Sequence, residues 1–355
     1  MIFAWGDIMA FELIPIEDYE RWDNVVRSFS NYDVFYLSGY NKSLKIHGDG
    51  EPFLFYIEHN NTRGINAVIK RDISLDPIFK DKLPKGQYFD FSSPYGYGGF
   101  LIEGTETKEI MNKYDEYCLN DGIVSEFVRF HLFNKAETYY NGSVIKKYDN
   151  IVRNLDISIE DIQKDFEYKV RKNLNRANQS GLYLEIDQTG QNLNDFLKIY
   201  YETMEKNNAK EYYYFKEDFF KQVHRMKGNF VYFYVFDKNG NRIATELVIY
   251  SKDYCYSFLG GTNPEYFSLR PNDFLKFEII KWAKEEKIKY FVLGGGYGPN
   301  DGIFRYKKSL APHGIYSFYI GKKIINHDKY NYLVEMKKKL EIVEARTDFF
   351  PEYRS

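Results

Sequence analysis

The chain has 355 residues, and its 49 Lys and Arg against 51 Asp and Glu give a formal net charge of −2. Hydrophobic residues make up 44% and charged residues 28%, which is the composition of a globular protein and excludes a disordered one. The balanced charge argues against indiscriminate nucleic-acid binding, for which a strongly basic domain is expected. Aromatic residues reach 19%, and the 34 tyrosines place a phenol wherever a ring borders water.

Three further features bear on the compartment and on metals. No run of about 18 uncharged apolar residues is present, so no transmembrane segment is expected. The first seven residues, MIFAWGD, lack the basic and apolar regions of a signal peptide. Cys118 and Cys255 lie far apart, and the six histidines are scattered, which argues against a disulfide scaffold and a zinc site. We therefore expect a cytoplasmic protein that binds no metal.

The first half of the chain reads as a mixture of helices and strands. In chain order we predict helices over 18–29 and 33–46, a hairpin of strands over 52–58 and 65–71, a glycine-rich passage over 95–99, a helix over 108–119 and a strand over 123–131.

The second half gives clearer signals. Ser158 and Asp161 form a capping box before one long amphipathic helix over 159–177. A hairpin is predicted around Asn239-Gly240, a strong turn signal. The other elements predicted are strands over 182–186, 254–259, 290–293 and 315–320, and helices over 193–204, 219–223, 272–282 and 303–310 and after His327.

The order of elements repeats in the two halves: helices, hairpin, glycine passage, helix, strand. This repetition predicts a tandem duplication of one unit, with domains over 1–150 and 151–355. Because hairpins are mixed with helix crossovers, we expect an α/β (α+β) fold. Each domain should have a twisted, mixed, largely antiparallel sheet flanked by helices.

The strongest candidate site follows the strand over 290–293. Gly294, Gly295 and Gly296 would let a ligand approach the backbone, and exposed N–H groups there could meet a phosphate or an oxyanion. A tight turn is the structural alternative. Arg305, Lys307 and Lys308 lie just downstream and could neutralise a phosphate or carboxylate, although a solvated helix face fits each cation alone.

Glu246 is the one charge in the apolar stretch IATELVI. If it faces a site, burial would raise its pKa and it could act as a general base. A solvent-facing position or an ion pair with Arg242 is equally compatible with the sequence.

Two further segments are weaker candidates for binding substrate. Arg171 and Arg176 belong to the stretch KVRKNLNR, which would suit a polyanion, although a solvated helix face is the simpler explanation. Tyr213 and Tyr214 belong to YYYF at 212–215, whose consecutive rings cannot all face one core, although ordinary packing accounts for them as well.

Four segments together resemble the Fem-type aminoacyltransferase and BioF2-like acyltransferase branch of the GNAT superfamily. They are YYETMEKNNA at 200–209, YYYF at 212–215, LGGG at 293–296 and DGIFRYKKSL at 301–310. The resemblance spans about residues 155–325. It implies two GNAT-like domains, of which the first is the more diverged, and it implies that Lys307 matches the lysine thought to assist transfer.

The resemblance also implies acyl transfer to an amine. Fem-type members take an amino acid from aminoacyl-tRNA and attach it to a peptidoglycan precursor, and other members are expected to use acyl-CoA. The acceptor would be a small-molecule, nucleotide-linked or lipid-linked amine, and tRNA a possible partner. One departure is that residues 268–273, SLRPND, replace the usual GNAT pyrophosphate loop, Arg/Gln-x-x-Gly-x-Gly/Ala.

The leading expectation is therefore an N-acyltransferase acting on cell-envelope precursors, sugars or peptides, with Glu246 as base and Lys307 as stabiliser. The expected donor is acyl-CoA or aminoacyl-tRNA. The alternatives are a non-catalytic module that binds a saccharide or peptide on a duplicated GNAT scaffold, and a partner-binding protein that uses its aromatic surplus as an interface.

Overall fold

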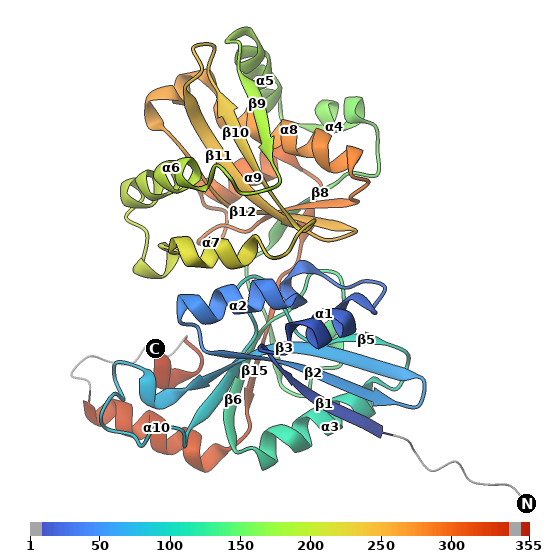
Figure 1. Cartoon of the computed structure of the whole chain (residues 1–355), viewed down its shortest axis with the longest axis vertical. Coiled ribbons are helices and arrows are strands. Elements are labelled where there is room, and N and C mark those ends of the chain that lie inside the picture. The colour runs from blue at the N-terminus through green and yellow to red at the C-terminus, as the bar shows by residue number, and fades with distance from the viewer. Residues whose placement is uncertain (1–8, 341–348) are drawn as a thin grey trace, which may run out of the picture. The chain divides into compact units, whose positions relative to one another are not determined.

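A computed structural model describes residues 9–340 and 349–355 of the chain. The first seven residues, which we expected not to form a signal peptide, lie outside the described part. The chain divides into two compact units, Met1–Lys147 with Phe318–Ser355, and Tyr148–Ser317 (Figure 1). No helix among the described residues is both long and apolar enough to cross a membrane.

The first unit is built on an eight-stranded sheet, with strand order β1-β2-β3-β4-β6-β15-β7 and β5 paired to β3. The strands are β1 (Met9–Pro15), β2 (Glu51–His59), β3 (Thr62–Asp72), β4 (Phe89–Ser92), β5 (Leu101–Glu103), β6 (Ile123–Arg129), β7 (Ser143–Lys146) and β15 (Tyr319–Ile324). Strand β4 pairs parallel to β6, and the other named pairs are antiparallel.

Helices cover both faces of this sheet. Helices α1 (Tyr19–Arg27) and α2 (Ser38–His47) lie on one face, and α3 (Thr107–Asn120) and α10 (His327–Leu340) lie on the other (Figure 1). Helix α1 begins where the Asp18 side chain accepts a hydrogen bond from the backbone N–H of Arg21, and it buries Trp22, Val25 and Val26, which recur at helical spacing.

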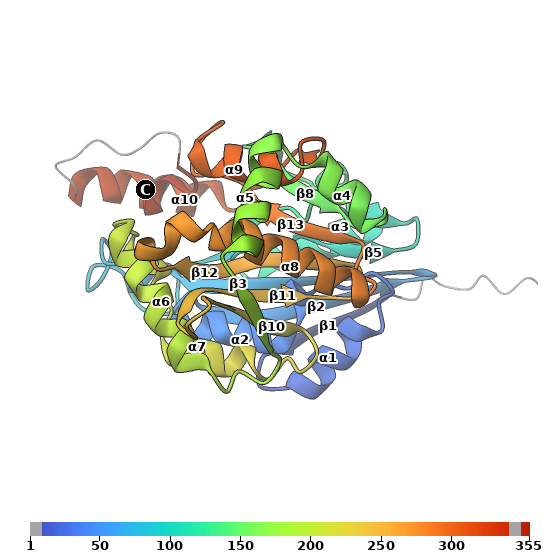
Figure 2. The same cartoon turned by 90° about the horizontal axis from the view of Figure 1, so that it is seen from above.

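The second unit has a seven-stranded sheet of order β14-β8-β13-β12-β11-β10-β9. The strands are β8 (Asn150–Asn154), β9 (Tyr183–Asp187), β10 (Phe230–Phe236), β11 (Arg242–Tyr250), β12 (Tyr254–Thr262), β13 (Tyr290–Gly294) and β14 (Ile315–Tyr316). Its helices are α4 (Ile159–Asp165), α5 (Tyr168–Gln179), α6 (Leu193–Lys206), α7 (Glu217–Val223), α8 (Pro271–Glu285) and α9 (Gly302–Leu310). Helices α6 and α7 cover one face, and α5, α8 and α9 the other (Figure 2).

The two sheets share one plan. Each sheet begins with an edge strand, β1 or β9, followed by a hairpin and a fourth strand. The fifth strand pairs parallel to the fourth, and two further antiparallel strands complete the sheet. The sequence predicted this fold class, and the structure confirms it. In each sheet the strand beyond the parallel pair comes from a distant part of the chain: β15 in the first unit and β8 in the second.

Four features differ from the sequence-based expectations. The helix over 33–46 begins only at Ser38, because the chain is extended at Leu37 after a short 3-10 turn over Val34–Tyr36. The helix over 159–177 is two helices, because the chain is extended at Phe166 and Glu167, where the buried Phe166 ring packs into the core. The strand over 315–320 is also two, β14 in one sheet and β15 in the other. The domain division expected at residue 150 differs in its last part, because β15 pairs with β6 and β7 and so carries residues 318–355 into the first unit.

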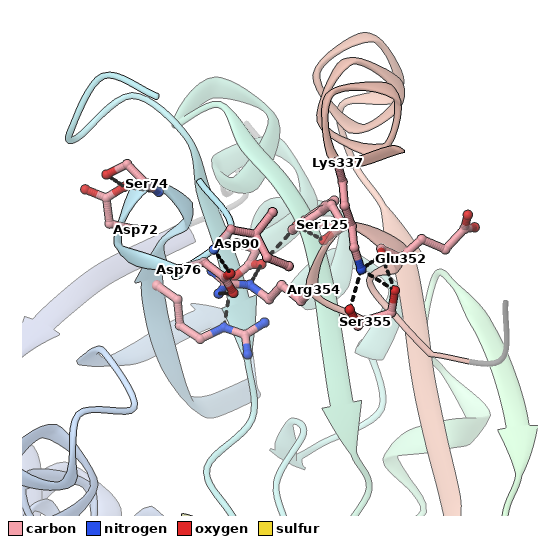
Figure 3. A network of polar contacts seen from close by, with 12 residues as sticks. Asp72, Ser74, Asp76, Asp90, Ser125, Lys337, Glu352, Arg354 and Ser355 are labelled. Atoms are coloured by element: carbon pink, nitrogen blue, oxygen red, sulfur yellow. Dashed lines mark hydrogen bonds and ion pairs between the residues drawn. The ribbon is translucent and has the colours of Figure 1, made fainter. Parts of the chain in front are cut away.

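The C-terminal segment docks onto the first unit through a network of charges (Figure 3). Asp90, which is fully buried, accepts hydrogen bonds of 2.7 Å from the Nε atoms of both Arg71 and Arg354. Arg354 also pairs with Asp76 at 3.2 Å, and Tyr353 Oη donates to Asp90 at 2.9 Å. These contacts hold residues 349–355 against the sheet.

Candidate active site

The parallel strands β12 and β13 of the second unit pair over a short stretch, from Tyr254 opposite Tyr290 to Tyr256 opposite Val292. Beyond this stretch, β12 continues along β11 to Thr262. Strand β13 instead ends at Gly294, whose φ of +81° turns the chain into a glycine loop, defined here as residues 294–302. The two strands therefore diverge at the carboxyl end of β13.

Glu246 lies on β11 beside this divergence and is 4% exposed. Its carboxylate is paired with Lys276 of α8, whose Nζ lies 2.6 Å from Oε1. Lys276 Nζ also donates to Ser257 Oγ of β12 at 2.6 Å. A buried carboxylate needs such a partner, because an unpaired charge away from water is costly.

Lys307 of α9 is the second charge at the divergence. Its Nζ donates a hydrogen bond of 2.6 Å to the carbonyl oxygen of Gly295, just after β13. Burial and the nearby charge of Lys276 lower the pKa of Lys307 to about 8, while Glu246 and Asp301 oppose the shift. The charges of Lys276 and Glu246 therefore both act on Lys307, whose lowered pKa lets it release its proton more readily than an exposed lysine would.

Asp301 organises the glycine loop from the first position before α9. Its carboxylate accepts hydrogen bonds from the backbone N–H groups of Phe304 at 2.7 Å, Tyr297 at 2.6 Å and Gly298 at 3.0 Å. These hydrogen bonds lower the pKa of Asp301. The amides of Tyr297 and Gly298 are thus used inside the loop.

A groove of about 530 Å³ lies on the same face of the unit, between α5, α9 and the start of α8. Lys169, Arg270 and Arg305 bring three positive charges to its lining. Helix α8 begins there without a side-chain cap, so its amino end adds partial positive charge. Burial raises the pKa of Asp273 in the lining, although Asn173, Arg270 and Lys169 oppose the shift.

Tyr306 connects the groove to the buried charges. It lines the groove, and its hydroxyl is buried without a hydrogen-bond partner among the described residues. Burial raises the pKa of Tyr306 well above its usual value, and the charges of Asp273 in the groove and of Glu246 on β11 add to the effect. The Tyr306 hydroxyl is therefore subject to the charges of both Asp273 in the groove and Glu246 on β11.

Comparison with known proteins shows which family the sequence of the second unit resembles. Residues 164–308 match the family described as an acetyltransferase (GNAT) domain. Over these residues the second unit matches a GNAT domain. This match confirms the resemblance that the sequence motifs indicated. No curated protein matches the chain.

Solved structures resemble the chain over most of its length. The FemX crystal structure has a TM-score of 0.66 at 14% identity and covers 91% of this chain and 99% of its own. L-PGS from Bacillus licheniformis has a TM-score of 0.57 at 14% identity, covering 90% and 96%. The C-terminal domain of a putative lysylphosphatidylglycerol synthetase from Agrobacterium fabrum has 0.53 at 13%, covering 91% and 96%. At such identities the likeness is one of fold.

The GNAT domain brings several predicted residues together. Lys307 lies beside Gly294 and Gly295, because its Nζ donates to the Gly295 carbonyl and a Cβ atom at Gly294 would lie 3.4 Å from it, and the charge of Glu246 acts on Lys307. Gly296 packs against Asp301, where a Cβ atom would lie 2.3 Å from Oδ1. The suggested ion pair between Glu246 and Arg242 does not form, because Arg242 pairs with Asp195 and Glu185.

Other predicted residues of the GNAT domain lie away from this point or have a structural role. Arg305 lines the groove and donates to the Asn300 carbonyl, and Lys308 is a half-buried residue of α9. Arg171 donates to the carbonyls of Lys164 and Phe166, so it holds the break between α4 and α5. Arg176 is exposed on α5.

Tyr213 and Tyr214 lie between α6 and α7, where the chain packs against α6. The Tyr200 hydroxyl donates to the Tyr213 carbonyl, and the Tyr214 ring stacks on Tyr201 with centroids 6.3 Å apart.

Lys276 is the residue of the GNAT domain that sequence reasoning missed. In the sequence it is one lysine among several on an amphipathic helix, and its contact with Glu246 spans 30 positions. No group of three or more His, Cys, Asp and Glu side chains suited to a metal occurs within residues 9–340 and 349–355.

Proposed function

We propose that the protein is a cytoplasmic N-acyltransferase that moves an acetyl or aminoacyl group from an activated donor to an amine. The amine would belong to a cell-envelope precursor, a sugar or a peptide. The observation that carries the proposal is Lys307 at the divergence of β12 and β13, next to the Glu246–Lys276 pair, in a GNAT domain. A buried cation beside a glycine-rich backbone segment supports this proposal.

The reaction needs little covalent work from the protein. The amine nitrogen attacks the acyl carbon, the carbonyl oxygen becomes negative, and the C–S bond of acyl-CoA or the C–O bond of aminoacyl-tRNA breaks. Lys307, as an ammonium, would donate to the developing oxyanion, and the backbone of Gly294–Gly296 would form one wall. Holding two substrates in line contributes several kcal/mol, on the order of 7–11 in the most favourable cases.

The attacking amine must also lose a proton. Glu246 remains our proposed acceptor, and it would first exchange Lys276 for the substrate amine, because Lys276 now binds its carboxylate. A positioned base contributes roughly 100- to 10,000-fold in rate. Gln at position 246 keeps the shape and removes the basicity, so Glu246→Gln tests this role.

The groove is the proposed place for the donor's phosphates, which both donors carry. Lys169, Arg270 and Arg305 supply charge, and the start of α8 supplies backbone polarity. A fold shared with a putative lysylphosphatidylglycerol synthetase fits an aminoacyl group as the one transferred. The exposed cations Lys172 and Arg176 on α5 would then contact tRNA.

A donor screen tests the proposal. The protein is incubated with acetyl-CoA or charged tRNA and a panel of sugar, peptide and lipid-linked amines, and the acylated products are identified by mass spectrometry. Binding of each donor is measured across a salt series, because tRNA affinity should fall steeply with salt. Lys307→Ala and Glu246→Gln should each lower turnover by about tenfold or more while the fold is kept. Ligand binding without transfer from either donor, or wild-type rates in both variants, would refute the proposal.

A further inference from the structure

Lys276 joins three elements of the second unit at one buried point. It lies in the middle of α8, its side chain is 12% exposed, and its Nζ reaches both Glu246 on β11 and Ser257 on β12. Its Nζ also lies 5.7 Å from the centre of the Phe291 ring on β13. The three neighbouring strands β11, β12 and β13 therefore all contact this one cation, at the place where β12 and β13 diverge.

The charges that act on Lys307 come from three elements. Lys276 lies on α8, Glu246 on β11, and Asp301 before the first turn of α9 itself. On β8 and α5, which also pack on α9, Arg153 and Arg171 are engaged elsewhere, and Lys169 lines the groove, where its charge acts on Asp273. Arg153 binds the Leu310 carbonyl and Asp165, and Arg171 binds the carbonyls of Lys164 and Phe166.

We propose that Lys276 is a positioning residue of the acyl-transfer site: it clamps the Glu246 carboxylate beside Ser257, and the clamped pair fixes the charge that Lys307 faces. For its effect on rate, this inference rests on the proposed function. Its effect on the protonation of Lys307 is a property of the free protein and is measured without a substrate.

The direction of the effect follows from the signs of the charges. Replacing Lys276 by methionine removes a positive neighbour of Lys307 and leaves Glu246 as an unpaired negative neighbour. Both changes favour the protonated form of Lys307, so its pKa should rise. Replacing Glu246 by glutamine does the opposite, because Lys276 then repels the Lys307 ammonium without compensation. The two single variants therefore shift the titration in opposite directions.

The experiment follows the titration of Lys307 by NMR in protein labelled with 13C at the lysine ε-carbon, with Lys307→Arg used to assign the signal. The midpoint should rise by about one pH unit or more in Lys276→Met and fall in Glu246→Gln. It should lie between these values in the double variant. Lys276→Arg, which keeps the charge, should stay near the wild type. Lys281→Met is the control, because Lys281 lies on the same helix and pairs with Glu278 instead.

Midpoints of Lys276→Met and Glu246→Gln that match the wild type would overturn the inference. If Lys276→Met does not fold, the Glu246→Gln and Lys276→Arg titrations decide the question. The rate of acyl transfer gives the second readout: its basic limb should move to higher pH in Lys276→Met by the same amount as the NMR midpoint, and an unmoved limb would overturn the role in transfer. A wild-type protein that transfers no acyl group would refute the proposed function, whereas the NMR titration would still decide the charge arrangement.

Discussion

Lys307 Nζ donates to the carbonyl oxygen of Gly295 at 2.6 Å, so a cation of α9 is fixed at the carboxyl end of β13. Burial disfavours the charged form of this lysine and lowers its pKa from 10.5 to about 8. The folded protein therefore binds this proton more weakly than the unfolded chain does.

This difference predicts a pH-dependent stability. Between about pH 8 and 10.5 the unfolded chain holds the Lys307 proton that the folded protein has released, so the stability of the wild type rises with pH in this window. Relative to Lys307→Met, the wild type should gain about 2 kcal/mol between pH 7 and 9.5. Urea unfolding at both pH values measures the gain, with the more exposed Lys281→Met as control. An equal difference at the two pH values would contradict the prediction.

The contact between Asp301 and Gly296 predicts that alanine is harmful at Gly296 and tolerated at Gly298. An alanine at Gly296 would place Cβ 2.3 Å from Asp301 Oδ1, so the carboxylate would have to leave the amides that it caps. An alanine at Gly298 would meet nothing within 4 Å. Because small misplacements at a site cost much of the rate, Gly296→Ala should lower turnover by about tenfold or more.

Gly298→Ala is the matched control and should keep nearly the wild-type rate. Steady-state kinetics and thermal melting of both variants separate a local change in the loop from general unfolding. Equal rates in the two variants would mean that the cap of α9 does not matter for transfer.

The buried carboxylate of Asp90 predicts that Arg354, near the end of the chain, stabilises the first unit. Burial alone would raise the pKa of Asp90, but Arg71 and Arg354 outweigh it and lower the pKa. Removing one partner of a buried ion pair lowers the free energy of unfolding by about 3–5 kcal/mol when the other charge stays unpaired. Because Arg71 still pairs with Asp90, Arg354→Met should cost less, about 2–3 kcal/mol.

The cost should appear at neutral pH and shrink in acid. The lowered pKa of Asp90 contributes stability that is present above its ordinary value of 3.8 and is lost as the pH falls through the folded value. Urea unfolding at pH 7 and at a pH well below 3.8 measures this, and Arg21→Met, which breaks an exposed pair with Glu12, is the control and should change little. A neutral Arg354→Met would refute the prediction.

Glu126 predicts a carboxyl group that is better neutral than charged. It is buried in the first unit, and Tyr114 Oη donates to its Oε1 at 2.5 Å. Burial raises its pKa, so its contribution to stability is full below about pH 4.5 and is lost as the pH rises through the folded value. Glu126→Gln should therefore gain stability relative to the wild type between pH 4 and pH 8, measured by urea unfolding. A constant difference would argue against it.

The sequence carried most of the fold because the patterns were local. The Asn239-Gly240 turn, the amphipathic spacing of the helices and the repeated order of elements each predicted an element that the structure contains. The break at Phe166 was not predictable from spacing, because apolar residues continue at helical intervals on both sides of it. It depends on where one ring packs and on the carbonyls that Arg171 binds.

The candidate site was predicted in part for a similar reason. A lone acid in an apolar strand indicated that Glu246 is special, and the structure buries it. Its partner could not be inferred, since Lys276 differs in no sequence feature from Lys281 or Lys284 on the same helix. The same holds for β15, whose partners in the first sheet are separated from it by the entire second unit.

The place of β15 has a consequence for how the protein is made. A ribosome releases the chain from its amino end, so residues 148–317 emerge complete while the first sheet still lacks the strand between β6 and β7. The first unit is thus begun first and completed last. The edges of β6 and β7 stay unpaired during synthesis until β15 has been made.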